Sequence, residues 1–222
     1  LFGTGLLLII LLFSGKIRAH VRTILSKHFF SYKYDYREEW LRFTQTMDES
    51  EDEVPERIIR AMATLVKSNA GTLWVRSGNN SFELLAHWNM PPPDYIGGSL
   101  LDPITKFIDQ THWVVDIDEY DSQPDIYGDL ALPPWLESIP NAWLLIPLIF
   151  KTEVLGIVLT KKSDLQQSIN WEDRDLLKMA GHQAASYLAQ YQSDQQLIQA
   201  RQFEAFNRLS AYVVHDLKNI LA

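Results

Sequence analysis

The chain has 222 residues, and 46% of them are hydrophobic, which is ample for a buried core and unlike a disordered polypeptide. Its formal net charge of −8 argues against a general nucleic-acid binder, because such a protein needs a basic surface to neutralise phosphates. No cysteine is present, which excludes disulfides, thiolate zinc sites, iron–sulfur clusters and thioether-linked chromophores.

An almost unbroken apolar run, residues 1–13, opens the chain, and the first residue is Leu rather than Met. About 13 residues are too few for a bilayer-spanning helix, which needs roughly 20. We therefore interpret residues 1–15 as the end of a transmembrane helix in a fragment of a longer protein. Basic residues, which mark the cytoplasmic side of a span, follow the run at Lys16, Arg18, Arg22 and Lys27. We expect an inner-membrane anchor with the rest in the cytoplasm; the alternative is a buried core helix that opens a soluble protein.

Residues 16–54 are expected to form a juxtamembrane connector. Aromatic residues are dense among charged ones at 27–43, a pattern that could stack nucleobases or lie at a membrane interface. We favour an amphipathic helix that packs on a partner copy or on the next domain, because the interleaved acidic residues spoil a nucleic-acid groove. An acidic run at 48–53 then indicates a solvated linker and a helix N-terminus.

Residues 55–163 have the pattern of one compact domain of helices and strands. We predict, in order, a helix at 56–67, strands at 72–76 and 81–88, a helix at 100–110, and strands at 113–117, 142–150 and 154–161. Short turn signals separate the first two strands and the last two, so each pair should form an antiparallel hairpin. The segment between the strands predicted at 113–117 and 142–150 contains prolines and is predicted to be a long loop.

The last two predicted strands contain a characteristic sequence motif. Residues 143–148 read Trp-Leu-Leu-Ile-Pro-Leu, and residues 154–159 read Val-Leu-Gly-Ile-Val-Leu. With the order of elements, this resembles a GAF domain, although the related PAS fold is a rival. The resemblance implies an α+β fold, an antiparallel sheet with flanking helices. GAF domains bind cyclic nucleotides, tetrapyrroles, haem or small metabolites, and many act as dimerising spacers, but the usual covalent bilin needs a cysteine that is absent here.

No metal site is predicted in this domain. His87 and His112 lack a second ligand at a usable helical spacing, although Asp109 is close to His112 in sequence. Six acidic residues could hold Ca²⁺ or Mg²⁺ but do not follow the EF-hand order, and we interpret them as a solvated loop: Asp116, Asp118, Glu119, Asp121, Asp125 and Asp129. We interpret the tryptophans at 74, 88, 113, 135 and 143 as core and pocket wall rather than a cation cage. Any ligand should be small and held noncovalently.

Residues 164–202 are predicted to be a signalling helix. Asn170 is a plausible N-cap before Trp171, and no proline follows, so the helix should continue for about 50 residues, as one helix or two in tandem. Apolar or small residues recur in three-and-four steps typical of a dimeric coiled coil, at Leu177, Ala184, Leu188, Tyr191 and Ile198. Gln195 and Gln202 interrupt this seam.

Residues 203–222 are predicted to begin the phosphoacceptor domain, and they contain His215-Asp-Leu-Lys-Asn219, which resembles the H-box of the histidine kinase phosphoacceptor helix. A neutral imidazole nitrogen can attack the γ-phosphorus of ATP, and a neighbouring carboxylate can hold the other ring proton. The resemblance implies that His215 is the phosphoacceptor and Asp216 the acid/base residue. Asn219 lies one helical turn on, where its amide could orient a water for dephosphorylation of the partner regulator.

The stretches at 27–44 and 206–219 resemble PrsK-type sensor histidine kinases, which accompany exosortase and PEP-CTERM protein-sorting systems. The resemblance implies a membrane-anchored homodimer and a response regulator that accepts the phosphoryl group. ATP and Mg²⁺ would be bound by a domain beyond residue 222, so the fragment alone should hold neither and should be inactive. Two alternatives stay open: a membrane-tethered GAF module for ligand binding or dimerisation without kinase activity, and another GAF-linked enzyme.

Overall fold

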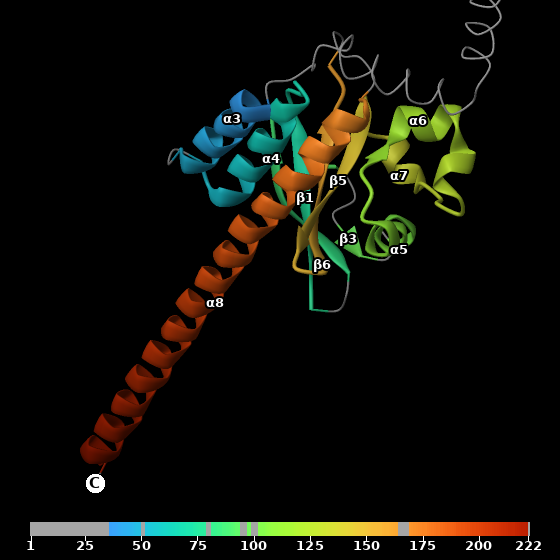
Figure 1. Ribbon diagram of the computed structural model, residues 1–222. Helices are drawn as coiled ribbons and strands as arrows, with labels where there is room; N and C mark the ends of the chain where they lie inside the picture. Colours follow the sequence, from blue (N-terminus) through green and yellow to red (C-terminus); the bar gives the residue numbers. More distant parts are fainter. Residues whose placement is uncertain are drawn as a thin grey trace, which may run out of the picture. The chain divides into compact units, whose positions relative to one another are not determined.

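A computed structural model describes residues 36–49, 52–78, 81–93, 97–98, 102–163 and 169–221 (Figure 1). Contacts divide the chain into two units, Leu1–Glu39 and Trp40–Ala222, and the second contains the folded domain. The predicted end of a transmembrane helix at 1–15 lies outside the described residues. Within the described ranges, no helix is long and apolar enough to cross a membrane.

Helices and strands are interspersed along the described part of the chain. The helices are α3 (Tyr36–Asp48), α4 (Val54–Leu65), α5 (Asp102–Thr111), α6 (Ile117–Ser122), the 3-10 helix η2 (Pro124–Tyr127), α7 (Pro134–Glu137) and α8 (Trp171–Leu221). The strands are β1 (Gly71–Arg76), β2 (Phe82–Trp88), β3 (Gly97–Gly98), β4 (Val115–Asp116), β5 (Ala142–Phe150) and β6 (Glu153–Lys161).

One antiparallel sheet joins all these strands in the order β3-β2-β1-β6-β5-β4. Both predicted hairpins are confirmed, with Thr72 opposite His87 in the first and Leu145 opposite Leu159 in the second. The central pair β1 and β6 brings the two hairpins together, although they are far apart in the sequence. A continuous sheet can therefore support a layer of helices on each face.

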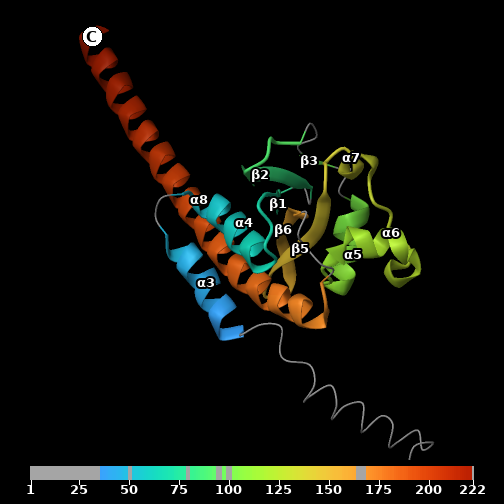
Figure 2. The ribbon, with the colours of Figure 1, turned by 90° about the horizontal axis from the view of Figure 1, so that it is seen from above.

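Helices α4 and α8 cover one face of the sheet (Figure 2). The apolar positions of α4 recur at helical spacing and are buried, among them Ile58, Ile59 and Met62. Gly71, the first residue of β1, leaves room for β6 and α4, because a Cβ atom there would lie 2.6 Å from the Leu159 carbonyl oxygen and 2.9 Å from Cγ2 of Ile59. The predicted amphipathic helix at 56–67 is thus confirmed as the helix that packs on β1 and β2.

The part of α3 that belongs to the folded domain also packs by its apolar side. Phe43 and Met47 are buried, and Arg57 of α4 donates a hydrogen bond to the Met47 carbonyl oxygen at 2.8 Å. The sequence-based interpretation of this stretch as an amphipathic helix is confirmed for these residues. The connector before Tyr36 lies outside the described part of the chain.

The opposite face of the sheet is covered by the segment between β3 and β5, and a second core fills the space beneath it. Its largest members are Trp74 from the sheet and Tyr127 from η2, which pack with Ile104 and Ile108 of α5. The sequence predicted this segment incompletely. The strand expected at 113–117 is shortened to β4, and the expected long loop contains α6, η2 and α7.

Helix α8 is a single helix of 51 residues. Its start is fixed by reciprocal capping: the side chain of Asn170 accepts from the Glu172 and Asp173 amides at 2.7 and 3.0 Å, and Asp173 accepts from the Asn170 amide at 2.8 Å. Gly181 then lets the helix touch β5, because a Cβ atom there would lie 2.6 Å from the Pro147 carbonyl oxygen. Beyond Gln192 the described residues of α8 are exposed, apart from half-buried Ser210.

Candidate functional site

The predicted phosphoacceptor motif lies in the last turns of α8. Residues 215, 216 and 219 have helical backbone, while their side chains are not among those that the structure describes. Their helical setting is confirmed, and it places positions 215 and 219 about one turn apart on one side of the helix. The chemical roles assigned to His215, Asp216 and Asn219 stay predictions.

An exposed apolar stripe runs along the same part of α8. Its members are Phe203, Phe206, Leu209 and Val213, and more than half of each side chain is accessible to solvent. Steps of three, three and four residues keep them near one side of a helix. Position 215 follows Phe206 by about two and a half turns and therefore lies on the opposite side. The helix thus separates an apolar face from the face that carries the predicted phosphoacceptor.

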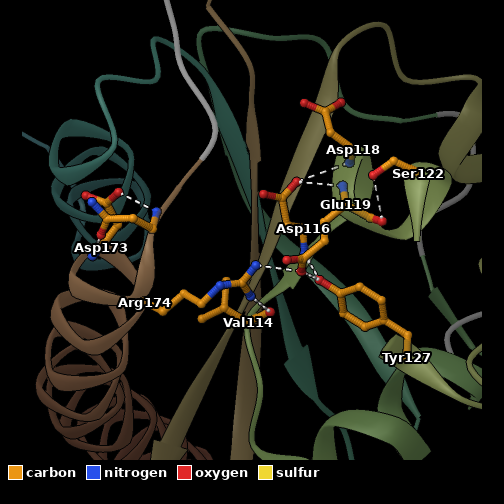
Figure 3. A network of polar contacts seen from close by, with 9 residues as sticks. Val114, Asp116, Asp118, Glu119, Ser122, Tyr127, Asp173 and Arg174 are labelled. Atoms are coloured by element: carbon orange, nitrogen blue, oxygen red, sulfur yellow. Dashed lines mark hydrogen bonds and ion pairs between the residues drawn. The ribbon is translucent and has the colours of Figure 1, made fainter. Parts of the chain in front are cut away.

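A second constellation, absent from the sequence-based predictions, connects α8 with the segment that covers the sheet (Figure 3). Asp116 is buried at the end of β4 and caps the N-terminus of α6, where its Oδ1 accepts from the amides of Asp118 and Glu119 at 3.1 and 3.4 Å. Its own amide donates to the Tyr127 hydroxyl at 3.1 Å. Burial raises the pKa of the Asp116 carboxyl above its usual value. The hydrogen bonds from the two amides therefore offset only part of the cost of burying this carboxyl group.

Glu119 is the centre of this constellation. Its Oε2 accepts a hydrogen bond from the Tyr127 hydroxyl and another from Nη2 of Arg174 at 2.6 Å. Nη1 of Arg174 also donates to the Val114 carbonyl oxygen at 3.1 Å. Because Arg174 belongs to the first turn of α8, one carboxylate links that helix with α6 and η2 (Figure 3).

The Tyr127 hydroxyl and the Arg174 guanidinium both keep their protons at neutral pH. Burial, together with the hydrogen bond to Glu119, raises the pKa of Tyr127 to about 12, so its hydroxyl remains a donor. Burial lowers the pKa of Arg174, but its interactions with Glu119 and Tyr127 outweigh that effect and the net pKa is raised. Since the folded pKa of Tyr127 exceeds its unfolded value near 10, its contribution to stability is constant below that pH and is lost as the pH rises through about 12.

Two hollows adjoin the network. The larger, about 840 Å³, lies between α5 and η2, with Lys106, Phe107 and Tyr127 in its wall. The smaller, about 230 Å³, is lined by Val114 and Glu119 and by Arg174 and Lys178 of α8. Trp113 and Ile126 line both hollows. The two hollows therefore lie next to each other at these residues, and we call them together the groove between α5 and α8.

The histidines and acidic residues singled out in the sequence have other surroundings. His87 is exposed, and Asp109 pairs with Arg76 at 2.6 Å rather than with His112. The acidic segment is not a simple solvated loop, because its first residues form α6, and Asp118 pairs with Lys162. In the described ranges, no group of three or more His, Asp or Glu side chains is arranged to hold a metal ion. The absence of a resident metal stays a prediction.

Arg174 could have been noticed in the sequence. It stands in a helical first turn among Glu172, Asp173 and Asp175, where the helix dipole favours acidic residues and disfavours a cation. A basic residue in such a position indicates a specific acidic partner. Nothing in the sequence alone identifies that partner as Glu119.

Replacing Tyr127 by phenylalanine should lower the free energy of unfolding by about 2 kcal/mol, because the change removes one donor and one acceptor from a buried network. Tyr120→Phe is the matched control. Its hydroxyl makes one hydrogen bond, to the Leu130 carbonyl oxygen at 3.0 Å, and its loss should cost about 1 kcal/mol or less. Urea denaturation measures both changes. Equal losses in the two variants would contradict a central role for Tyr127.

No family model and no curated protein matches the sequence. Solved structures do match. The chain is similar to the GAF domain of a phosphoenolpyruvate-protein phosphotransferase from Coxiella burnetii, with a TM-score of 0.54 and 12% identity over 72% of this chain and 96% of that one. The corresponding domain from Acinetobacter matches with a TM-score of 0.53 and 12% identity, over 73% and 97%. The folded domain has the GAF fold.

Residues 122 to 287 of a methyl-accepting chemotaxis protein also match, with a TM-score of 0.51 and 16% identity over 67% of this chain and 94% of that one. Sequence identities this low establish the fold alone. The predicted α+β GAF fold is thus confirmed. The PrsK-type assignment and the kinase function stay predictions.

Proposed function

We propose that the chain is the sensory part of a PrsK-type histidine kinase, in which the GAF domain controls phosphorylation of His215. The observation that carries the proposal is the continuity of α8. One helix leaves the GAF sheet, extends beyond the described globular core and contains the His-Asp-x-x-Asn motif in its last turns. A signal that moves the start of α8 would therefore be transmitted along the helix to the phosphoacceptor.

The proposed chemistry uses three residues of this chain. A ring nitrogen of His215 attacks the γ-phosphorus of ATP, so that an N–P bond forms while the bond to the leaving ADP oxygen breaks. Asp216 holds the other ring proton and stabilises the imidazolium that develops. Asn219 positions the water that later hydrolyses the phosphorylated regulator. ATP and Mg²⁺ would be bound by an ATPase domain encoded beyond residue 222, and a response regulator aspartate would receive the phosphoryl group.

The exposed stripe of α8 supports a dimer of this chain. The stripe is a continuous row of four exposed apolar side chains rather than scattered surface residues: Phe203, Phe206, Leu209 and Val213. In coiled coils, a second helix covers a helix face of this kind. A parallel partner on this stripe would leave position 215 on the outer side, accessible to an ATPase domain. The homodimer, the inner-membrane anchor and the cytoplasmic location of the GAF domain are all parts of the proposal.

Replacing Phe206 by glutamate should weaken the dimer by at least about tenfold, because it places a charge in the apolar contact. Arg201→Gln is the matched control: it makes the same change in net charge on an exposed residue outside the stripe, and it should leave the dimer intact. Sedimentation equilibrium measures both dissociation constants. A Phe206→Glu protein that dimerised as tightly as the Arg201→Gln protein would contradict the stripe as the interface.

Labelling by ATP tests the kinase itself. The protein extended by the encoded ATPase domain should form phosphohistidine, and the form without the His215 imidazole should not. If the encoded sequence beyond residue 222 lacks a second amphipathic helix and an ATPase domain, the kinase proposal is wrong and the chain is a GAF module without kinase activity or part of another GAF-linked enzyme.

A further inference from the structure

We infer that the groove between α5 and α8 binds a small aromatic anion, and that Tyr127 and Glu119 communicate its presence to α8. The inference concerns ligand binding at the GAF domain and does not depend on phosphorylation of His215. It rests on the shape of the groove, its exposed apolar residues, its charges and the hydrogen bonds that leave it.

Two large apolar side chains that line the groove are exposed to solvent. Trp113 and Ile126 line both hollows, and 42% and 44% of their respective surfaces are accessible. The ring of Phe107 meets Trp113 edge to face at a centroid distance of 6.2 Å, which fixes the indole in the wall. Exposed large side chains in a concave surface are characteristic of ligand sites, and a planar ring is the shape that an indole face accommodates.

The sheet side of the domain offers a different environment. Trp74, Ile108 and Leu145 pack there with other buried residues in a continuous core. All described residues that line the larger hollow come instead from α5, from the link to β4, and from η2 and the residues that follow it. The proposed site is therefore built by the covering segment, and Tyr127 belongs both to its wall and to the core on the sheet.

A lysine lines each of the two hollows. Lys106 of α5 lines the larger hollow, and Lys178 of α8 lines the smaller one. The acidic residues in the two walls are Asp129 and Glu119, and Glu119 is already paired with Arg174. An anionic group near Lys178 would gain a favourable interaction without displacing that ion pair. The charge distribution therefore favours an anion over a cation.

The same groove is connected to the signalling helix. The Tyr127 ring is part of its wall, while the Tyr127 hydroxyl donates to Glu119, which holds Arg174 in the first turn of α8. A ligand that shifts the ring changes a hydrogen bond to the carboxylate that anchors α8. Only two residues, Tyr127 and Glu119, therefore lie between a ligand in the groove and Arg174 of α8 (Figure 3).

Anilinonaphthalene sulfonate, a fluorescent aromatic anion, is a suitable probe. We expect the 222-residue chain to bind it, with affinity reduced about tenfold in Trp113→Ala and about two- to fivefold in Lys178→Gln. The matched control is Met179→Ala, which removes a neighbouring exposed apolar side chain outside the two hollows and should leave the affinity unchanged. The uncharged N-phenylnaphthylamine should bind without sensitivity to Lys178→Gln.

Hydrogen exchange of the amides at 171–182 tests the second half of the inference. Bound probe should alter their exchange in the unmodified chain and not in Tyr127→Phe, which keeps the ring and removes the hydroxyl. If Trp113→Ala and Met179→Ala bind the probe equally well, the site is overturned. If the probe alters α8 exchange equally with and without the Tyr127 hydroxyl, the link to α8 is overturned. Neither result depends on whether His215 accepts a phosphoryl group.

Discussion

Phosphohistidine is expected to disappear when His215 is replaced by alanine in a protein that carries the ATPase domain. The imidazole supplies the attacking nitrogen, and the alanine side chain has no nucleophile to replace it. Incorporation of radiolabel from ATP that is stable in base and labile in acid measures the modification. The label should fall to the background level, because no acceptor nitrogen remains at position 215. The dimer should persist, because the apolar stripe lies on the other side of α8.

Two neighbouring substitutions separate the proposed roles. Asp216→Asn should slow autophosphorylation without removing the acceptor, because the amide cannot take up a proton as the carboxylate does. Asn219→Ala should spare autophosphorylation and impair dephosphorylation of the regulator. Wild-type rates of phosphohistidine formation in the His215→Ala protein would refute the kinase proposal, while leaving the GAF fold and the groove unaffected.

Gly181→Ala should reduce the stability of the domain by about 2 kcal/mol. Alanine favours an α-helix over glycine by about 1 kcal/mol, so the helix considered alone would gain stability. The added Cβ atom, however, would lie 2.6 Å from the Pro147 carbonyl oxygen, and a strand backbone in a packed sheet cannot retreat as a flexible side chain can. Overpacking of this kind costs about 1–3 kcal/mol, and contact with backbone places the cost at the upper end of that range.

Gly78→Ala is the control for this experiment. A Cβ atom at Gly78 would meet no heavy atom within 4 Å, so the substitution should be neutral or slightly stabilising through its effect on the unfolded chain. Thermal and urea unfolding followed by circular dichroism measure both variants. A Gly181→Ala protein as stable as the Gly78→Ala protein would show that α8 does not need its close approach to β5.

The parts of the fold that could be predicted are those in which local pattern and burial agree. The hairpin of β5 and β6 consists of long apolar strands around a short turn, and α4 shows the spacing of a helix with one buried face. The start of α8 was visible in Asn170, whose capping hydrogen bonds are present. Each of these signals is contained within one continuous stretch of the sequence.

The segment between β4 and β5 could not be predicted because its order comes from distant contacts. Its prolines and acidic residues suggest a loop, yet Asp116 caps α6 and Tyr127 is buried against α5. The pairing of Glu119 with Arg174 spans 55 positions in the sequence. The histidine motif is the opposite case, since its residues are neighbours on one helix and a short pattern suffices to find it. A groove built from α5, η2 and α8 has no comparable local pattern.

The absence of any proline or second glycine from α8 has a mechanical consequence. Kinks in helices arise mostly at such residues, so α8 is expected to behave as a stiff rod anchored near its beginning. At 1.5 Å per residue, position 215 is roughly 50 Å from His182, whose ring nitrogen bonds to the Ile149 carbonyl oxygen at 2.9 Å. A tilt of about 5° at that anchor displaces the far end by about 4 Å. Coupling between two binding sites is reciprocal, so we expect that a partner that holds the far end would also change the affinity of the proposed groove beside Arg174.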